Sequence, residues 1–265
     1  MIPTLFARSM RSCTVVMVAL VAVALMYIAS VVYLYDPAVS ESLTAMQEAM
    51  PELFAAFGMA NTATTLLDFL INYLYGFLFT ALLIVLAVYL AQRFLASPIK
   101  DGSFAWILAT PHSRTAIIMT FVVAEVVTVA LVVAFCWIGE VVFCEIWFPG
   151  ELDLVGLARA NGGLFVLGFF MTSLCLVLTC VLKNPSLGLG IGAALCVLFF
   201  LMELAGTVGE GLTWVAHVSP CSLYDAYGLA AGNASAFADI ALVGAFAVIF
   251  NILAGVVFVR RDFSL

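Results

Sequence analysis

The sequence predicts an all-α, polytopic membrane protein in which six helices cross the bilayer. Three observations lead to this fold class: 66% of the 265 residues are hydrophobic, only 9% are charged, and the mean hydropathy is +1.23. A soluble domain of this size would need far more charge to cover its exterior. The apolar residues also gather into six runs, each near the length of about 20 residues that a helix needs to cross a hydrocarbon core.

The expected spans cover residues 13–35, 68–91, 115–138, 162–182, 187–205 and 239–259. Each must be helical because lipid offers no hydrogen-bond partners to a bare backbone. The runs are too long, and too uniformly apolar, for the strands of a membrane barrel. A signal peptide is an alternative for the first run, because Arg8 and Arg11 precede it. The run is longer than a typical signal-peptide core, so we expect a retained helix.

The segments between the runs differ in kind. The sequence Asn-Pro-Ser at residues 184–186 predicts a tight turn between the fourth and fifth runs. The longer gaps at residues 36–67, 139–161 and 206–238 still contain apolar residues. Such gaps predict short helices that lie in the membrane interface. Nothing in the composition divides the chain, so we expect a single domain over residues 1–265.

The basic residues are distributed unequally between the two sets of gaps. Eight of the nine fall on one side of the six-span pattern: Arg8, Arg11, Arg93, Lys100, Arg114, Lys183, Arg260 and Arg261. Basic loops are retained in the cytoplasm, which predicts a multi-pass protein of the cell (plasma) membrane with both termini cytoplasmic. The formal net charge of −7 argues against nucleic acid as a partner, because nucleic-acid binding needs a basic face.

The expected cytoplasmic loop at residues 97–114 carries the strongest local pattern. Its first two residues, a serine and a proline, suit the N-cap and first turn of a helix. Phe104, Ile107 and Leu108 follow with i, i+3, i+4 spacing and form one apolar face, and Pro111 ends the helix. This spacing predicts a short amphipathic helix that lies at the membrane surface. Such a helix either presents a docking face or is a connector with no partner.

Three stretches of the chain resemble a known family. They are Asp101-Gly102-Ser103 with Ile107-Leu108-Ala109-Thr110-Pro111 and Ser113-Arg114; Val218-Ser219-Pro220 with Tyr224-Asp225 and Leu229-Ala230-Ala231-Gly232; and Phe258-Val259-Arg260-Arg261-Asp262-Phe263. In this order they resemble the ABC-2-type permeases, the membrane subunits of ATP-binding cassette exporters. The span count agrees over the whole chain. Many relatives have a Gly-Lys pair early in the third span, and this chain departs from them with Thr120-Phe121.

The resemblance implies a division of labour between subunits. A cytoplasmic ABC ATPase subunit would bind ATP and Mg, and two permease copies or two related permeases would line an export path. The loop would be the coupling helix held by that ATPase, through Asp101, Gly102, Phe104, Ile107, Leu108, Pro111 and Arg114. Asp101 and Arg114 would either fix the docking angle or only cap helix ends. The sequence has no G-x-x-x-x-G-K-[ST] pattern, so we expect no enzyme activity and no bound cofactor in this chain.

Polar residues inside the expected spans form a possible intramembrane polar site. Glu125 lies deep in the third span, where a carboxyl is costly. It is either a relay for protons or cations, or a protonated acid that hydrogen-bonds a neighbouring helix. Asn72 and Asn251 are expected to join helices by hydrogen bonds. Other acids lie near the expected outer ends of spans, where snorkelling lowers their cost: Asp68, Glu140, Glu203 and Asp239.

Other patterns are weaker. Gly188 and Gly192 form a small-xxx-small pair, which favours close helix packing over a gating hinge. The seven cysteines include no C-x-x-C, so we expect no metal site. Cys144 and Cys221 both fall on the expected outer side and are candidates for a disulfide. Two alternatives to a permease stay open: a membrane scaffold or sensor subunit, and a secondary transporter driven by protonation of Glu125.

Overall fold

The computed structural model describes residues 1–35, 46, 49–50, 53, 65–208 and 213–261. Within these residues all regular structure is helical, and six helical segments are long and apolar enough to cross a membrane, which confirms the predicted fold class. They are α1 (Pro3–Tyr33), the segment Leu78–Lys100 that begins with α5 (Leu78–Ala91), α8 (Arg114–Trp147), α9 (Leu154–Val181), α10 (Pro185–Val208) and α13 (Ala234–Arg260).

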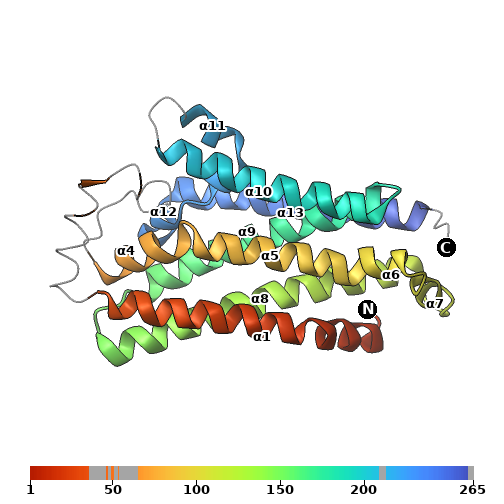
Figure 1. The fold of residues 1–265 in the computed structure, drawn as a ribbon, viewed down its shortest axis with the longest axis horizontal. Coiled ribbons are helices and arrows are strands. Elements are labelled where there is room, and N and C mark those ends of the chain that lie inside the picture. The colour runs from red at the N-terminus through yellow and green to blue at the C-terminus, as the bar shows by residue number, and fades with distance from the viewer. Residues whose placement is uncertain (36–45, 47–48, 51–52, 54–64, 209–212, 262–265) are drawn as a thin grey trace.

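The long helices lie side by side, and both chain ends lie at the same end of the bundle (Figure 1). We call this the termini end. It also carries the short helices α6 (Ser97–Lys100) and α7 (Phe104–Leu108). The opposite end, here the far end, carries α4 (Leu66–Leu70), α11 (Thr213–Val218) and α12 (Ala226–Ala231). The chain therefore places short helices at both ends of a six-helix bundle.

Helix α9 is the centre of the bundle. It contacts α5, α8, α10, α12 and α13, and 72% of its most apolar window is buried. By contrast, α1, α10 and α13 bury 28%, 22% and 22% of theirs. Because these three helices are apolar and largely uncovered, their outer faces suit contact with lipid or with another membrane subunit.

Several predicted boundaries were wrong. Helix α1 begins ten residues before the predicted span and contains both Arg8 and Arg11, because hydropathy marks the apolar core of a helix and not its ends. The second predicted span is interrupted at residues 76–77, where Phe77 leaves helical geometry with φ −131° and ψ −58°. Before this break lie α4 and the π-helix η1 (Ile71–Tyr75), and after it lies α5. One apolar run thus contains two helical segments.

A short helix does begin at Ser97 with Pro98 in its first turn, but the N-cap role predicted for Ser97 was wrong. The chain runs from α5 through the π-helix η2 (Gln92–Ala96) into α6 without leaving helical geometry, and Ala96 is already helical with φ −63°. Pro98 has no N–H to donate, and it follows directly on a π-turn where the regular helical hydrogen bonding is already altered. The proline is therefore tolerated inside this segment.

The predicted outer gaps had mixed outcomes. The gap at 139–161 is mostly helical, since α8 continues to Trp147 and α9 starts at Leu154. The gap at 206–238 does contain short helices, namely α11, the 3₁₀-helix η4 (Pro220–Leu223) and α12, as expected. Those expected between residues 36 and 64 lie largely outside the described part of the chain.

The close packing predicted for Gly188 and Gly192 is confirmed. A Cβ atom at Gly192 would lie 3.0 Å from the Cα atom of Cys175, and one at Gly188 would collide with the carbonyl oxygen of Leu178. Both glycines thus face the backbone of α9, whereas Gly190 faces open space. The pair lets α10 approach the central helix closely at the termini end.

Candidate functional site

The loop between α5 and α8 folds as two short helices, and its apolar face points into the protein. Phe104 is fully buried, and its ring meets that of Phe258 edge to face, with 5.8 Å between the centroids. Ile107 and Leu108 are partly buried and pack against the same core. The spacing of the three residues was interpreted correctly as one face. The expectation that Phe104 belongs to an exposed docking face was wrong, because this ring anchors α7 to α13.

The exposed side of α7 carries a tryptophan instead. Trp106 is 81% exposed, the largest exposed fraction among the large apolar side chains of the described residues. Sequence reasoning missed it, because spacing shows which residues share a face and not which face is covered. Pro111 is exposed, and it follows Thr110, whose hydroxyl donates to the carbonyl oxygen of Ile107 at 2.7 Å. The loop therefore presents Trp106 outward on a helix fixed from behind.

The turn between α6 and α7 depends on Gly102. Its φ of +71° lies in the left-handed region, which favours glycine. Asp101 is exposed and lines a cavity of about 150 Å³ together with Arg8 and Arg93. Asp101 and Gly102 thus shape the turn that leads into α7.

Arg114 caps a helix end. Its Nη1 donates to the carbonyl oxygens of Val259 at 3.2 Å and of Arg261 at 2.7 Å, at the end of α13. Arg261 in turn donates to Thr179, Cys180 and Lys183, whose carbonyl oxygens lie at or just past the end of α9. Helix ends leave carbonyls unpaired and carry a partial negative charge, so both arginines are well placed. Of the two roles expected for Arg114, the structure favours capping.

Glu125 and Asn251 meet at a residue that sequence reasoning missed. The Ser173 hydroxyl lies 3.3 Å from Glu125 Oε1, and Asn251 Nδ2 donates to Ser173 Oγ at 2.6 Å. The cluster joins α8, α9 and α13 in the buried middle of the bundle. Asn251 joins helices as predicted. Glu125 bonds a neighbouring helix, which agrees with the structural alternative. A serine in an apolar run is too common to reveal this role from sequence.

Asn72 does not join the cluster. It is buried in η1, and neither its Oδ1 nor its Nδ2 has a hydrogen-bond partner within the described part of the chain. The expected interhelical bond was therefore wrong for this residue. The physical reason is its place in a π-helix: the wider turn changes the face on which a side chain projects, which α-helical spacing cannot anticipate.

A second polar cluster lies nearer the far end. Glu140 Oε2 accepts from the Tyr75 hydroxyl at 3.0 Å and from Asn161 Nδ2 at 2.8 Å, so η1, α8 and α9 are joined. Glu140 is fully buried, and the expected snorkelling was wrong for it. The side chain finds protein partners instead of reaching the interface. Asn161 was assigned to a loop, which hid its place beside Glu140.

Cys144 and Cys221 are both buried free thiols, so the candidate disulfide is absent. Burial raises the pKa of Cys221 to about 12, which keeps that thiol protonated at neutral pH. Among the described residues no group of three or more His, Cys, Asp or Glu side chains is placed to hold a metal ion.

The stretches that resemble the ABC-2 family have clear local roles. Ser219 caps η4 by accepting from the Cys221 N–H, and Asp225 caps α12 by accepting from the Gly228 N–H. Gly232 ends α12 with φ +83°. At the point of departure from the family, Thr120 accepts a hydrogen bond from the Ile2 N–H at 2.9 Å. No protein-family model matches the chain, and a search of curated proteins finds no match either.

Proposed function

We propose that the chain is the permease subunit of an ABC transporter, which exports a substrate using ATP hydrolysed by a separate cytoplasmic ATPase subunit. One observation carries the proposal: a loop helix that is fixed from behind by Phe104 and presents the exposed Trp106 at the basic end of the bundle. Tryptophan is the side chain most enriched at the energetic centres of protein interfaces. ATP and Mg would be bound by the partner and not by this chain.

The loop has direct connections to the spans. Phe104 contacts Phe258 on α13, and Arg114 at the loop's end holds the end of the same helix. A movement imposed on α7 would therefore reach α13, and through Arg261 the central helix α9. Closure of two ATPase subunits would act by favouring one arrangement of these helices over another. The uncovered faces of α1, α10 and α13 suit a second permease copy or a related permease.

The distribution of charge supports the proposed orientation. The termini end carries eight of the nine basic residues, and such ends are retained in the cytoplasm. In the proposed arrangement α7 and both termini face the cytoplasm of a cell-membrane protein. The abundance of apolar surface favours an amphipathic or lipid-soluble substrate. A resident of the bilayer could enter between helices without crossing water.

The test is complex formation with a P-loop ATPase encoded beside this chain, using Trp106→Asp. We expect this variant to weaken the complex by tenfold or more and to lower ATPase-coupled transport. The matched control is Trp214→Asp, because Trp214 is 67% exposed on another short helix at the far end. Phe104→Asp is not a clean test, because it buries a charge. Normal binding by Trp106→Asp, or equal loss with Trp214→Asp, would contradict the proposal.

A proton-coupled transporter is the second candidate, and Glu125 favours it. Glu125 Oε2 is buried with no hydrogen-bond partner among the described residues, so one oxygen is available to a proton or a ligand. This candidate predicts transport driven by a proton gradient without ATP, and its loss in Glu125→Gln. A scaffold or sensor subunit would bind the partner through α7 and show no transport under either driving force.

A further inference from the structure

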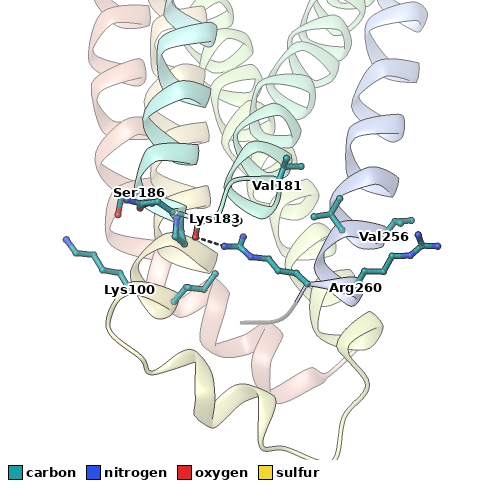
Figure 2. A pocket seen from close by; sticks show the side chains of 11 residues that line it. Lys100, Val181, Lys183, Ser186, Val256 and Arg260 are labelled. Carbon is teal, nitrogen blue, oxygen red and sulfur yellow. Dashed lines mark hydrogen bonds between the residues drawn. The ribbon is translucent and has the colours of Figure 1, made fainter. Parts of the chain in front are cut away.

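The termini end contains a large open pocket that the proposed coupling role does not use. It has a volume of about 1180 Å³ and lies between α6, the turn from α9 to α10, and the end of α13. Figure 2 shows Lys100 on one side of the pocket and Arg260 on the other, with Lys183 between them. Its position at the ends of the spans places it where lipid headgroups meet water.

The charged residues of this pocket are all positive. Its eleven lining residues, all within the described part of the chain, include Lys100, Lys183, Arg260 and Arg261 and no acid. Arg261 is held by carbonyl oxygens, among them that of Lys183 at 2.8 Å, the bond drawn in Figure 2. The other three side chains are exposed. Like charges around one cavity repel each other, and an anion placed among them is attracted by all.

The pocket also has an apolar wall. Ile99, Val181, Val256 and Val257 line it beside the cations. Apolar side chains do not stabilise a free inorganic anion, whereas they can pack against an acyl chain that is attached to a phosphate. The Ser186 hydroxyl adds a neutral polar group on the same lining. Basic pockets between spans on the cytoplasmic side are suited to anionic headgroups.

We propose that this pocket binds an anionic phospholipid, with its phosphate among Lys100, Lys183 and Arg260 and an acyl chain against the valine wall. The inference stands whether or not the chain couples to an ATPase.

A second basic cavity at the termini end differs from this pocket in its lining. Arg8, Arg11 and Arg93 line a space of about 410 Å³ at the same end, but its other lining residues are only Ala7 and Ser12. Among the described residues, that cavity has no valine or isoleucine on its lining.

The test compares phosphatidylglycerol with phosphatidylcholine in binding to the full-length protein in detergent, by native mass spectrometry and by thermal shift. We expect phosphatidylglycerol to bind at least tenfold more tightly. Lys183→Gln combined with Arg260→Gln should remove most of this preference. Arg8→Gln combined with Arg11→Gln, which removes the same charge at the same end, should leave it within about twofold.

Two further measurements distinguish a bound lipid from free phosphate and show whether a loss of binding is due to misfolding. Val256→Trp keeps every charge but places a bulky indole on the valine wall where the acyl chain would lie, and it should weaken phosphatidylglycerol binding while leaving the protein monodisperse. Inorganic phosphate at millimolar concentration should not compete. The proposal is overturned if the Lys183 and Arg260 variant binds as wild type does, if both double variants lose binding equally, or if inorganic phosphate displaces the lipid.

Discussion

Arg114 Nη1 donates to the backbone oxygen of Arg261 at 2.7 Å, while the guanidinium of Arg261 donates to the backbone oxygen of Cys180, also at 2.7 Å. Arg114, at the start of α8, therefore caps the end of α13, and Arg261, at the end of α13, caps the end of α9. Hydrogen bonds therefore join three helix ends at the same end of the bundle as α7. These hydrogen bonds make the termini end a connected unit, although its residues come from three distant parts of the chain.

Removing the first of these caps should loosen that unit. Arg114→Gln loses charge-assisted bonds to carbonyls of α13, and partial exposure reduces their worth to about 1 kcal/mol. We expect the melting temperature of the purified protein to fall by about 2–4 °C. Arg11→Gln is the control, since Arg11 is an exposed arginine at the same end. A loss in Arg11→Gln as large as that in Arg114→Gln would show that net charge, and not capping, is responsible.

The glycines of α10 offer a sharper packing test. Gly188→Ala and Gly192→Ala each place a methyl group against the backbone of α9, which cannot move aside cheaply. Overpacking of this kind costs about 1–3 kcal/mol, so both variants should melt at a lower temperature. Gly190→Ala meets no described residue within 4 Å and should melt within about 1 °C of the wild type or above it. The interpretation fails if all three behave alike.

Each sequence pattern predicts only the structural property that it encodes. Hydropathy encodes burial in lipid, so the six spans were predictable, but the break at Phe77 and the extension of α8 to Trp147 were not. Spacing encodes shared faces, so Phe104 and Leu108 were grouped correctly and their inward direction was missed. The polar clusters required contacts between helices far apart in sequence. Glu125 could be singled out from its depth, whereas Ser173 could not.

The stability of the cluster around Glu125 should depend on Ser173, which contacts both other members, and not on the charge of the carboxyl group. Ser173→Ala removes the contacts to both Glu125 and Asn251, and we expect it to lower stability by about 0.6–2 kcal/mol. Glu125→Gln keeps an oxygen toward Ser173 and should fold and transport as the wild type does. Thr179→Val is the control, because among the described residues the Thr179 hydroxyl bonds only within its own helix, to the Cys175 carbonyl.

Each variant can be followed by thermal melting in detergent and by transport in reconstituted vesicles. Loss of transport in a stable Glu125→Gln would favour the proton-coupled alternative. Equal destabilisation by Ser173→Ala and Thr179→Val would contradict this prediction. It would show that the contacts of Ser173 with α8 and α13 add no stability beyond that of a hydrogen bond within α9.

The cluster around Glu140 differs from the cluster around Glu125, because its two donors share one acceptor oxygen. Tyr75 and Asn161 both donate to Glu140 Oε2, so Glu140→Leu would leave two buried donors without that partner. An unsatisfied buried group costs about 1–3 kcal/mol, and we expect a fall in melting temperature of several degrees. Glu140→Gln retains one acceptor oxygen and should lose little. Glu145→Leu, exposed one turn further along α8, is the control.

The shared acceptor also predicts how substitutions combine. Tyr75→Phe alone removes the hydroxyl that donates to Glu140 and that lies beside Asn161 Nδ2. Once Glu140 is leucine, the Tyr75 hydroxyl has already lost this acceptor, so removing it also relieves an unsatisfied donor. The double variant should therefore be destabilised by less than the sum of the two single losses, with a coupling of about 0.5–3 kcal/mol. Strict additivity in a double-mutant cycle would mean that the two side chains are neighbours without a shared bond.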